Sequence, residues 1–487
     1  MRRRTFLRSG VAALAAGTAT VAVADRTRSY GPMGELQLAG AKELVTDDRG
    51  IGYVAVTDGF ATVDLADPTA PELLAERRPI LAEEGGPLTG IFDVKHDDGT
   101  LAVAGPAQSG QFRAFALYDV GDPAEPQRIG YTETGTPIHN CAFQDGYVYL
   151  TGNGLQGNPM VVYDAADGSP EKVAEWSLLD HEPAWRDVYT GLYNLHDLYV
   201  RGGYAYLAYW DAGAWILDVS DPTAPAYVSN VGPYAPEDLA DLSGNDALAR
   251  FYEPPGNAHY TAVDDDGTLL GVGAEAWEVD AGTDDGGPGG IDLWDVSDPA
   301  SPAKLSTIAP TDVDDATQGT GTWTTAHNFE LHGGRLYSSW YQDGVKVHDV
   351  SDPAEPELLA HWRRPGETSF WTAQVVEPGE YFVASDASYT LPGADGTVKT
   401  FPDEQGTQED QPPLEADPTP TATPDVPTTG VPPTTVPPST DAGTPDGTPT
   451  DTATVSGTEE DSPGFGALAA VGGLSLAGLR MFRERNE

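Results

Sequence analysis

A short turn recurs along the chain and constrains its fold more than any other feature. In the clearest copy, residues 349–356, it reads Asp-Val-Ser-Asp-Pro-Ala-Glu-Pro. Aspartate can hydrogen-bond its own backbone and proline fixes φ, so each copy favours a tight turn. Strand-length runs rich in Val, Leu, Tyr and Trp lie on both sides of it, which is typical of β-strands. Further copies occupy residues 64–71, 119–126, 218–225 and 295–302, and a degenerate copy occupies 164–170.

The repeating unit is a four-stranded meander, most clearly seen in residues 326–363. One such sheet cannot bury both of its faces, so it must stack on copies of itself. Six units carry the turn, and a seventh begins at Ser369 but lacks its outermost strand. Residues 35–38 match the outermost-strand pattern, so we expect them to complete the seventh sheet and close the ring. The prediction is an all-β, seven-bladed β-propeller over residues 35–401, with a six-bladed ring or an open stack as the alternative.

The repeat, an apolar strand followed by Asp and then Asp-Pro-x-x-Pro, resembles that of LVIVD-repeat proteins. That resemblance implies a β-propeller of a bacterial or archaeal cell surface. It covers residues 35–401 and carries little information about activity.

The charge of the chain is strongly negative. Its 76 Asp and Glu against 26 Lys and Arg give a formal net charge of -50. Such a chain repels phosphates, which argues against nucleic acid as a partner. Abundant loop aspartate and scarce lysine resemble the salt-adapted proteins of halophilic archaea, with an acidic secreted protein from another source as the alternative. A single cysteine, Cys141, excludes an intrachain disulfide.

The N-terminal segment, residues 1–24, has the pattern of a signal peptide. A basic start precedes an apolar run of small residues, and Ala22-Val23-Ala24 fits the cleavage pattern, with cleavage expected after Ala24. Residues 3–8 read Arg-Arg-Thr-Phe-Leu-Arg, which resembles the twin-arginine motif. We therefore expect the Tat translocase to export the protein after it has folded.

The C-terminal part lacks the composition of a core. Residues 402–461 are rich in Thr, Pro, Asp and Gly, which predicts a disordered stalk. Residues 462–487 contain Pro463-Gly464-Phe465, a short apolar run and a basic tail. This arrangement resembles the PGF-CTERM sorting signal, in which an archaeosortase replaces the tail with a lipid. A plain C-terminal anchor helix is the alternative, and either one tethers the protein to the outer face of the membrane.

Four histidines share one position at the start of the first strand of successive units: His139, His196, His259 and His327. In this alignment Gly90 takes that position in the second unit and Thr372 takes it in the seventh. The first strand of each blade lines the central channel, so the imidazoles should form a partial ring at one mouth. Converging imidazoles bind zinc, copper, iron or nickel. They could instead bond the neighbouring blade and only stabilise the fold.

The loops after the second strands should open on the same face. They carry Tyr209, Trp210 and Asp211 in the fourth unit, Glu275 in the fifth, and Tyr341 and Gln342 in the sixth. Aromatic side chains beside carboxylates at a channel mouth suit a small ligand or a sugar, although strand-end aromatics also pack between blades. Cys141 could be a further metal ligand or a small buried hydrophobic residue.

Two functions follow from these patterns. The first is a non-catalytic surface protein that binds a partner protein, a glycan or a small ligand through one propeller face, because no nucleophile, phosphate or nucleotide motif is present. The second is a metal-dependent extracytoplasmic enzyme using the four histidines, by analogy with selenium-binding protein propellers. The sequence specifies neither the ligand nor the metal.

Overall fold

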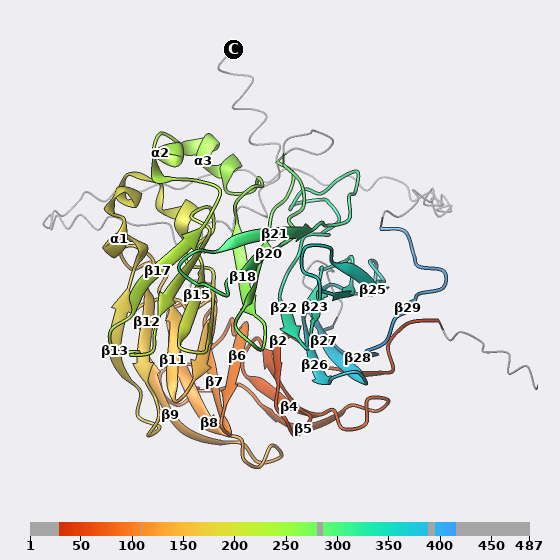
Figure 1. The fold of residues 1–487 in the computed structure, drawn as a ribbon. Helices are drawn as coiled ribbons and strands as arrows, with labels where there is room; N and C mark the ends of the chain where they lie inside the picture. Colours follow the sequence, from red (N-terminus) through yellow and green to blue (C-terminus); the bar gives the residue numbers. More distant parts are fainter. Residues whose placement is uncertain (1–28, 109, 280–285, 388–394, 415–487) are drawn as a thin grey trace, which may run out of the picture.

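The computed structural model describes residues 29–108, 110–279, 286–387 and 395–414. Seven antiparallel sheets stand around a common axis in this part of the chain, so the predicted seven-bladed β-propeller is confirmed (Figure 1). The signal peptide, the sorting motif and residues 415–461 of the predicted stalk lie outside the described residues.

Each blade is a four-stranded meander that runs outward from the axis. Blades 1 to 4 comprise β2 (Ala41–Thr46), β3 (Ile51–Val56), β4 (Phe60–Asp64) and β5 (Glu72–Arg77); β6 (Asp93–Asp97), β7 (Thr100–Gly105), β8 (Ala114–Asp119) and β9 (Gln127–Glu133); β10 (Cys141–Gln144), β11 (Tyr147–Thr151), β12 (Met160–Asp164) and β13 (Glu171–Trp176); and β14 (Asp197–Arg201), β15 (Tyr204–Ala208), β16 (Ala214–Asp218) and β17 (Ala226–Val231).

The remaining blades follow the same order. Blades 5 to 7 comprise β18 (Ala258–Val263), β19 (Leu269–Ala274), β20 (Ile291–Asp295) and β21 (Ala303–Ile308); β22 (Phe329–His332), β23 (Arg335–Ser339), β24 (Val345–Asp349) and β25 (Glu357–Trp362); and β26 (Phe370–Glu377), β27 (Tyr381–Asp386), β28 (Thr397–Pro402) and β1 (Gly34–Gln37).

The two ends of the propeller domain meet in blade 7. Strand β1 pairs antiparallel with β28, with Gly34 opposite Thr400 and Gln37 opposite Thr397. The outermost strand of the last blade therefore comes from the start of the chain, as the sequence predicted. Because this pairing closes the ring, neither end of the stack of blades is left without a neighbour.

The recurring turn shapes the blades that carry it, and at several junctions it also fastens the blade to the preceding one. Its first aspartate accepts a hydrogen bond from the backbone N–H two residues on, as Asp349 does from Ser351 at 2.8 Å. A hydroxyl of the preceding blade then donates to the carbonyl of the first proline. Thr62 donates to Pro123 at 2.6 Å, and Ser306 donates to Pro353 at the same distance. The turn thus forms the blade and also connects it to its neighbour.

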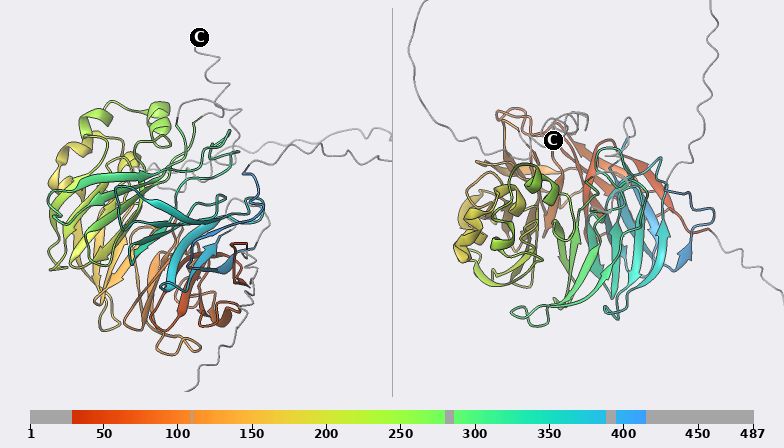
Figure 2. Two further views of the ribbon diagram at one scale, coloured as in Figure 1. Left: turned by 45° about the vertical axis from the view of Figure 1, so that its right-hand side comes forward. Right: turned by 90° about the horizontal axis from the view of Figure 1, so that it is seen from above.

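Two insertions place short helices at one end of the propeller, on the side of blades 3 to 5 (Figures 1 and 2). The first holds α1 (Leu178–His181) and two 3-10 turns, η1 (Pro183–Asp187) and η2 (Thr190–Tyr193). The second holds α2 (Pro236–Leu239) and α3 (Gly244–Arg250). No helix in the described ranges is long and apolar enough to span a membrane.

The chain that follows β28 packs on the propeller before it leaves the described residues. Strand β29 (Gly406–Thr407) pairs in parallel with β25 of blade 6. Asp403 accepts hydrogen bonds from the Tyr337 hydroxyl at 2.8 Å and the Gly379 N–H at 2.7 Å. Residues 403–414, which the sequence assigned to the stalk, therefore cover the outer edge of blade 6.

Candidate metal centre

The innermost strand of each blade presents one side chain at the same end of the central channel. The pairing of β18 with β19 skips His259, and the pairing of β26 with β27 skips Trp371. In β2 the pairing skips Lys42 and the residue after it. Such β-bulges redirect a side chain out of the regular alternation, and they are common next to functional sites.

Six of these side chains form a closed ring of aromatic groups around the axis, here called the aromatic belt. The distances between neighbouring ring centroids are 4.2 Å for His139–His196, 3.9 Å for His196–His259, 4.7 Å for His259–His327, 4.4 Å for His327–Trp371, 5.5 Å for Trp371–Phe92 and 5.9 Å for Phe92–His139. The predicted convergence of the four histidines is therefore present.

The alignment that placed Gly90 and Thr372 beside the histidines was wrong. Isolated backbone bridges join Thr57 to Ile91, Trp210 to Ala258 and Tyr341 to Phe370. The residue after each bridge occupies the belt position, which makes Phe92 and Trp371 the equivalents of His259. Lys42 occupies the position in blade 1, with its Nζ 5.4 Å from the centre of Trp371.

Hydrogen bonds to backbone carbonyls fix the tautomers of two belt histidines, His196 and His327. Nδ1 of His196 lies 3.0 Å from the carbonyl oxygen of His259, and Nδ1 of His327 lies 2.6 Å from that of Trp371. A carbonyl can only accept, so each Nδ1 carries the proton and each Nε2 keeps its lone pair. Second-shell contacts of this kind orient histidine ligands at metal sites.

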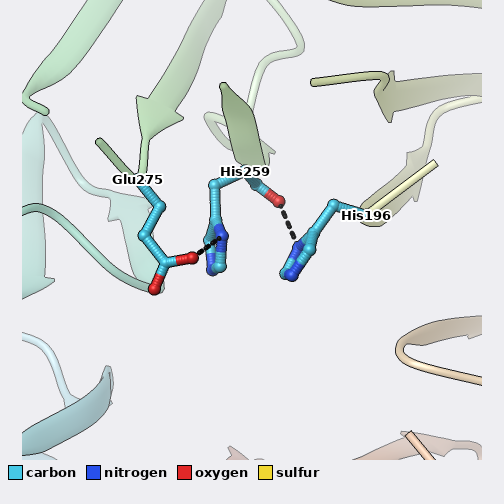
Figure 3. A group of neighbouring side chains, drawn as sticks. All are labelled: His196, His259 and Glu275. Atoms are coloured by element: carbon cyan, nitrogen blue, oxygen red, sulfur yellow. Dashed lines mark hydrogen bonds and ion pairs between the residues drawn. The ribbon is translucent and has the colours of Figure 1, made fainter. Parts of the chain in front are cut away.

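Glu275 follows β19, and its carboxylate contacts Nδ1 of His259, as backbone carbonyls contact Nδ1 of His196 and His327. Its Oε2 lies 2.9 Å from Nδ1 of His259, and its Oε1 accepts a hydrogen bond from the Tyr341 hydroxyl. Figure 3 shows the rings of His196 and His259 side by side and pointing the same way, with Glu275 on the far side of His259. His259 is thus held by a carboxylate, with its Nε2 edge on the same side as that of His196.

Burial shifts the pKa values of several side chains in and beside the belt. Burial, reinforced by the neighbouring histidines, lowers the pKa of His139 to about 4 and that of His327 to about 3, and it lowers the pKa of His196 well below its usual range. Burial by itself would raise the pKa of Glu275, but its contacts with His259 lower it to about 2. Burial therefore favours neutral imidazoles at His139, His196 and His327, and Glu275 is an ionised carboxylate.

One group of side chains in the described residues meets the geometric requirement for binding a metal ion. Ligand atoms of His196, His259 and Glu275 all lie within 4.8 Å of one another, and each side chain is buried. His327 and His139 flank this group through their ring contacts in the belt. Imidazole nitrogen with carboxylate oxygen suits zinc, copper, iron or nickel.

Not all the predicted ligand-binding residues join this centre. Trp210 lies 5.7 Å from His196, and Tyr341 lies 4.7 Å from His327, measured between ring centroids. Tyr209 instead donates its hydroxyl to the Asn158 carbonyl inside the core.

Asp211 and Gln342 form hydrogen bonds with the protein backbone and do not join the candidate metal centre. Asp211 is fully buried, with its N–H bonded to the Leu192 carbonyl. Gln342 donates to the Pro365 carbonyl and accepts from the N–H of Trp323.

Cys141 packs in an apolar cluster, and burial raises the pKa of its thiol well above the usual value. That environment fits a small buried hydrophobic residue better than a metal ligand.

Comparison with known proteins agrees with this fold. The LVIVD repeat model matches residues 194–232, the stretch of blade 4 that contains His196 and Trp210. The β-propeller domain of Cps50 (Swd1) from Myceliophteria thermophila is 10% identical; the match covers 77% of this chain and 99% of that one, with a TM-score of 0.51. The WD40 β-propeller domain of Doa1 is also 10% identical, with coverages of 77% and 98% and a TM-score of 0.49. No curated protein shows significant sequence similarity. At 10% identity the likeness to the Cps50 domain extends to the fold alone.

Proposed function

We propose that this chain is a cell-surface β-propeller that binds a transition-metal ion inside the aromatic belt. The observation that carries the proposal is the buried group of His196, His259 and Glu275, whose ligand atoms lie within 4.8 Å of one another. These three side chains are the proposed ligands. His327, whose Nδ1 lies 2.6 Å from the Trp371 carbonyl oxygen, borders them.

Three protein ligands leave a coordination position open, as in metal sites that bind a small molecule or carry out catalysis. His139 lies 4.2 Å from His196 between ring centroids, so a fourth imidazole borders that position. The surface-protein and metal-dependent functions inferred from the sequence are therefore compatible: the exported propeller presents a metal centre to small ligands.

The proposed location rests on sequence features at both ends of the chain. The leader resembles a twin-arginine signal, and the C-terminal segment resembles a lipid-attachment signal read by an archaeosortase. Export after folding would allow the metal to be inserted before the protein leaves the cell. The stalk would then hold the propeller away from the membrane.

Metal analysis of the purified, folded chain in high salt tests the proposal. We expect about one copper, zinc, iron or nickel ion per chain, lost in a His196→Ala/His259→Ala variant. The matched control is His181→Ala/His332→Ala, because neither of these histidines belongs to the belt. A metal-free wild-type protein would overturn the proposal, as would full metal retention by the belt variant.

A further inference from the structure

A second set of polar side chains lies next to the belt along the innermost strands. Each member directly follows the residue at the belt position of its blade, and the set is here called the polar layer. Its members are Glu43, Asp93, Asn140, Asp197 and Asn328. All five side chains are buried. Polar groups that water does not reach are costly unless they find a partner inside the protein or a bound ion.

One hydrogen bond shows that the polar layer reaches into the central channel. The amide of Asn328 donates to Oε2 of Glu43 at 2.6 Å. Asn328 precedes β22 of blade 6, whereas Glu43 lies in β2 of blade 1, and blade 7 stands between these two blades. Side chains of blades that are not neighbours meet only on the inner side of the ring. The polar layer therefore lines a buried section of the channel.

The polar layer contains more negative than positive charge. Lys95 of blade 2 pairs with Asp93, and its Nζ lies 3.9 Å from Oε1 of Glu43. Burial raises the pKa of the Asp197 carboxyl well above its usual range, and the charge of Lys95 opposes that rise. The same ammonium group thus acts on all three carboxylates of the layer. Among the described residues of this section, one positive charge faces three carboxylates, and two negative charges are left over.

Two oxygen atoms of the polar layer have no hydrogen-bond partner within the described residues. They are Oδ2 of Asp197 and Oδ1 of Asn328. The two side chains are only 1% and 3% exposed. Carboxylate and amide oxygens are the ligands that Ca²⁺ prefers, and the ion accepts about six to eight oxygens in a flexible geometry. The layer therefore offers the type of ligand atom and the charge that a calcium ion needs.

Other acidic groups of the described chain lack this combination. The carboxylate of Asp265 is bonded to Arg201 and to the N–H of Gly333. Both carboxylate oxygens of Asp211 lack a partner in the described ranges. Asp211 is a single buried carboxylate, however, and the charge of Arg250 opposes the rise in its pKa that burial causes. The polar layer differs because its unpartnered oxygens coincide with an excess of negative charge.

We propose that a calcium ion binds in the polar layer, between Glu43, Asp197 and Asn328. Its two positive charges balance the two negative charges that Lys95 leaves over. The ion joins blades 1, 4 and 6 across the channel, so it stabilises the closed ring. The oxygen ligands distinguish this site from the transition-metal centre, in which imidazole nitrogens take part. The calcium site goes beyond the proposed function and does not depend on it.

Equilibrium unfolding of the full chain by denaturant tests the proposal. An ion that binds only the folded state raises the denaturant midpoint as its concentration rises. The measurement is made in high salt, which screens exposed carboxylates, with Ca²⁺, with Mg²⁺ or with a chelator. We expect Ca²⁺ to raise the midpoint of the wild type more than Mg²⁺ does, and Glu43→Gln to lose this difference. Asp211→Asn, which alters a buried carboxylate outside the layer, is the matched control and should keep it.

The calcium content of the same samples gives an independent readout. We expect about one tightly held calcium ion per chain in the wild type and in Asp211→Asn, and none in Glu43→Gln. A wild-type chain without calcium would overturn the proposal, as would equal responses to Ca²⁺ in the wild type and Glu43→Gln. If Glu43→Gln does not fold, Asn328→Ala must lose the response instead. Transition-metal content is recorded in parallel, and a chain that holds calcium alone overturns only the proposed function.

Discussion

Nδ1 of His259 lies 2.9 Å from Oε2 of Glu275, inside a belt where the neighbouring histidines use backbone carbonyls for the same purpose. A carboxylate in this position fixes the ring and increases the basicity of the opposite nitrogen. The Tyr341 hydroxyl holds the other carboxylate oxygen, so Glu275 is fixed at both ends. This pair places an imidazole and a carboxylate of the candidate metal centre side by side.

Glu275→Gln should weaken metal binding without unfolding the propeller. The amide keeps the shape of the side chain but lacks the negative charge that favours the bound His259. Loss of this carboxylate should lower metal affinity at least about 10-fold. Competition with a chelator of known affinity measures the change. Glu367→Gln, which alters a largely exposed carboxylate paired with Arg364, is the control. Equal affinity of Glu275→Gln and wild type would rule out this role for Glu275.

Deletion of residues 35–40 should destabilise the domain strongly. It removes most of β1 and the buried Leu38, and it exposes the edge of β28. Loss of the Leu38 side chain alone removes about 1.5–3 kcal/mol of burial free energy. Denaturant unfolding measures the change in the free energy of unfolding. The control is Glu175→Gln, which breaks an exposed ion pair with Lys172 and should change that free energy by less than about 1 kcal/mol. A deletion variant as stable as wild type would show that the ring does not depend on this strand.

Asp211 provides a test of pH dependence outside the belt. Burial raises the pKa of its carboxyl to about 8, although Arg250 acts in the opposite direction. The native state therefore holds this proton more tightly than the unfolded state, and the contribution of Asp211 to stability falls as pH rises from about 4 to about 8.

Asp211→Asn should remove the loss of stability that accompanies the rise in pH. At about 1.4 kcal/mol per pKa unit, we expect the variant to gain a few kcal/mol over wild type at pH 8 and almost nothing near pH 4. Chemical denaturation of both proteins across this range measures the difference, and the low-pH arm is the internal control. A difference that does not change with pH would show that the Asp211 carboxyl titrates at its ordinary pKa.

The fold could be predicted because its determinants are local and repeated. The marker turn contains its own hydrogen bond, as Asp349 and Ser351 show, and its spacing sets the number of sheets. The closure through β1 could be predicted because residues 35–38 have the outermost-strand pattern without a turn of their own. The docking of residues 403–414 could not, since it depends on Asp403 meeting Tyr337 and Gly379 across more than 20 positions of sequence.

The candidate site was predictable only in part. Four histidines in one register are visible in the sequence, but Phe92, Trp371 and Lys42 share that register without sharing the residue type. Bulges at His259 and Trp371 shift the position by one, which a strict alternation of strand residues does not reveal. One signal was available: the belt residue is followed by Glu43, Asp93, Asn140, Asp197 or Asn328 in five of the blades. The contact between Glu275 and His259 joins residues from different loops, so only the structure identifies it.

The most direct test of the metal centre is an anomalous-scattering map from crystals of the copper-loaded protein. The account predicts one peak inside the belt, about 2.0–2.1 Å from a ring nitrogen of His196 and of His259 and about 2.0–2.2 Å from a carboxylate oxygen of Glu275. A map with no peak inside the belt would contradict the account, as would a metal ion bound away from these three side chains.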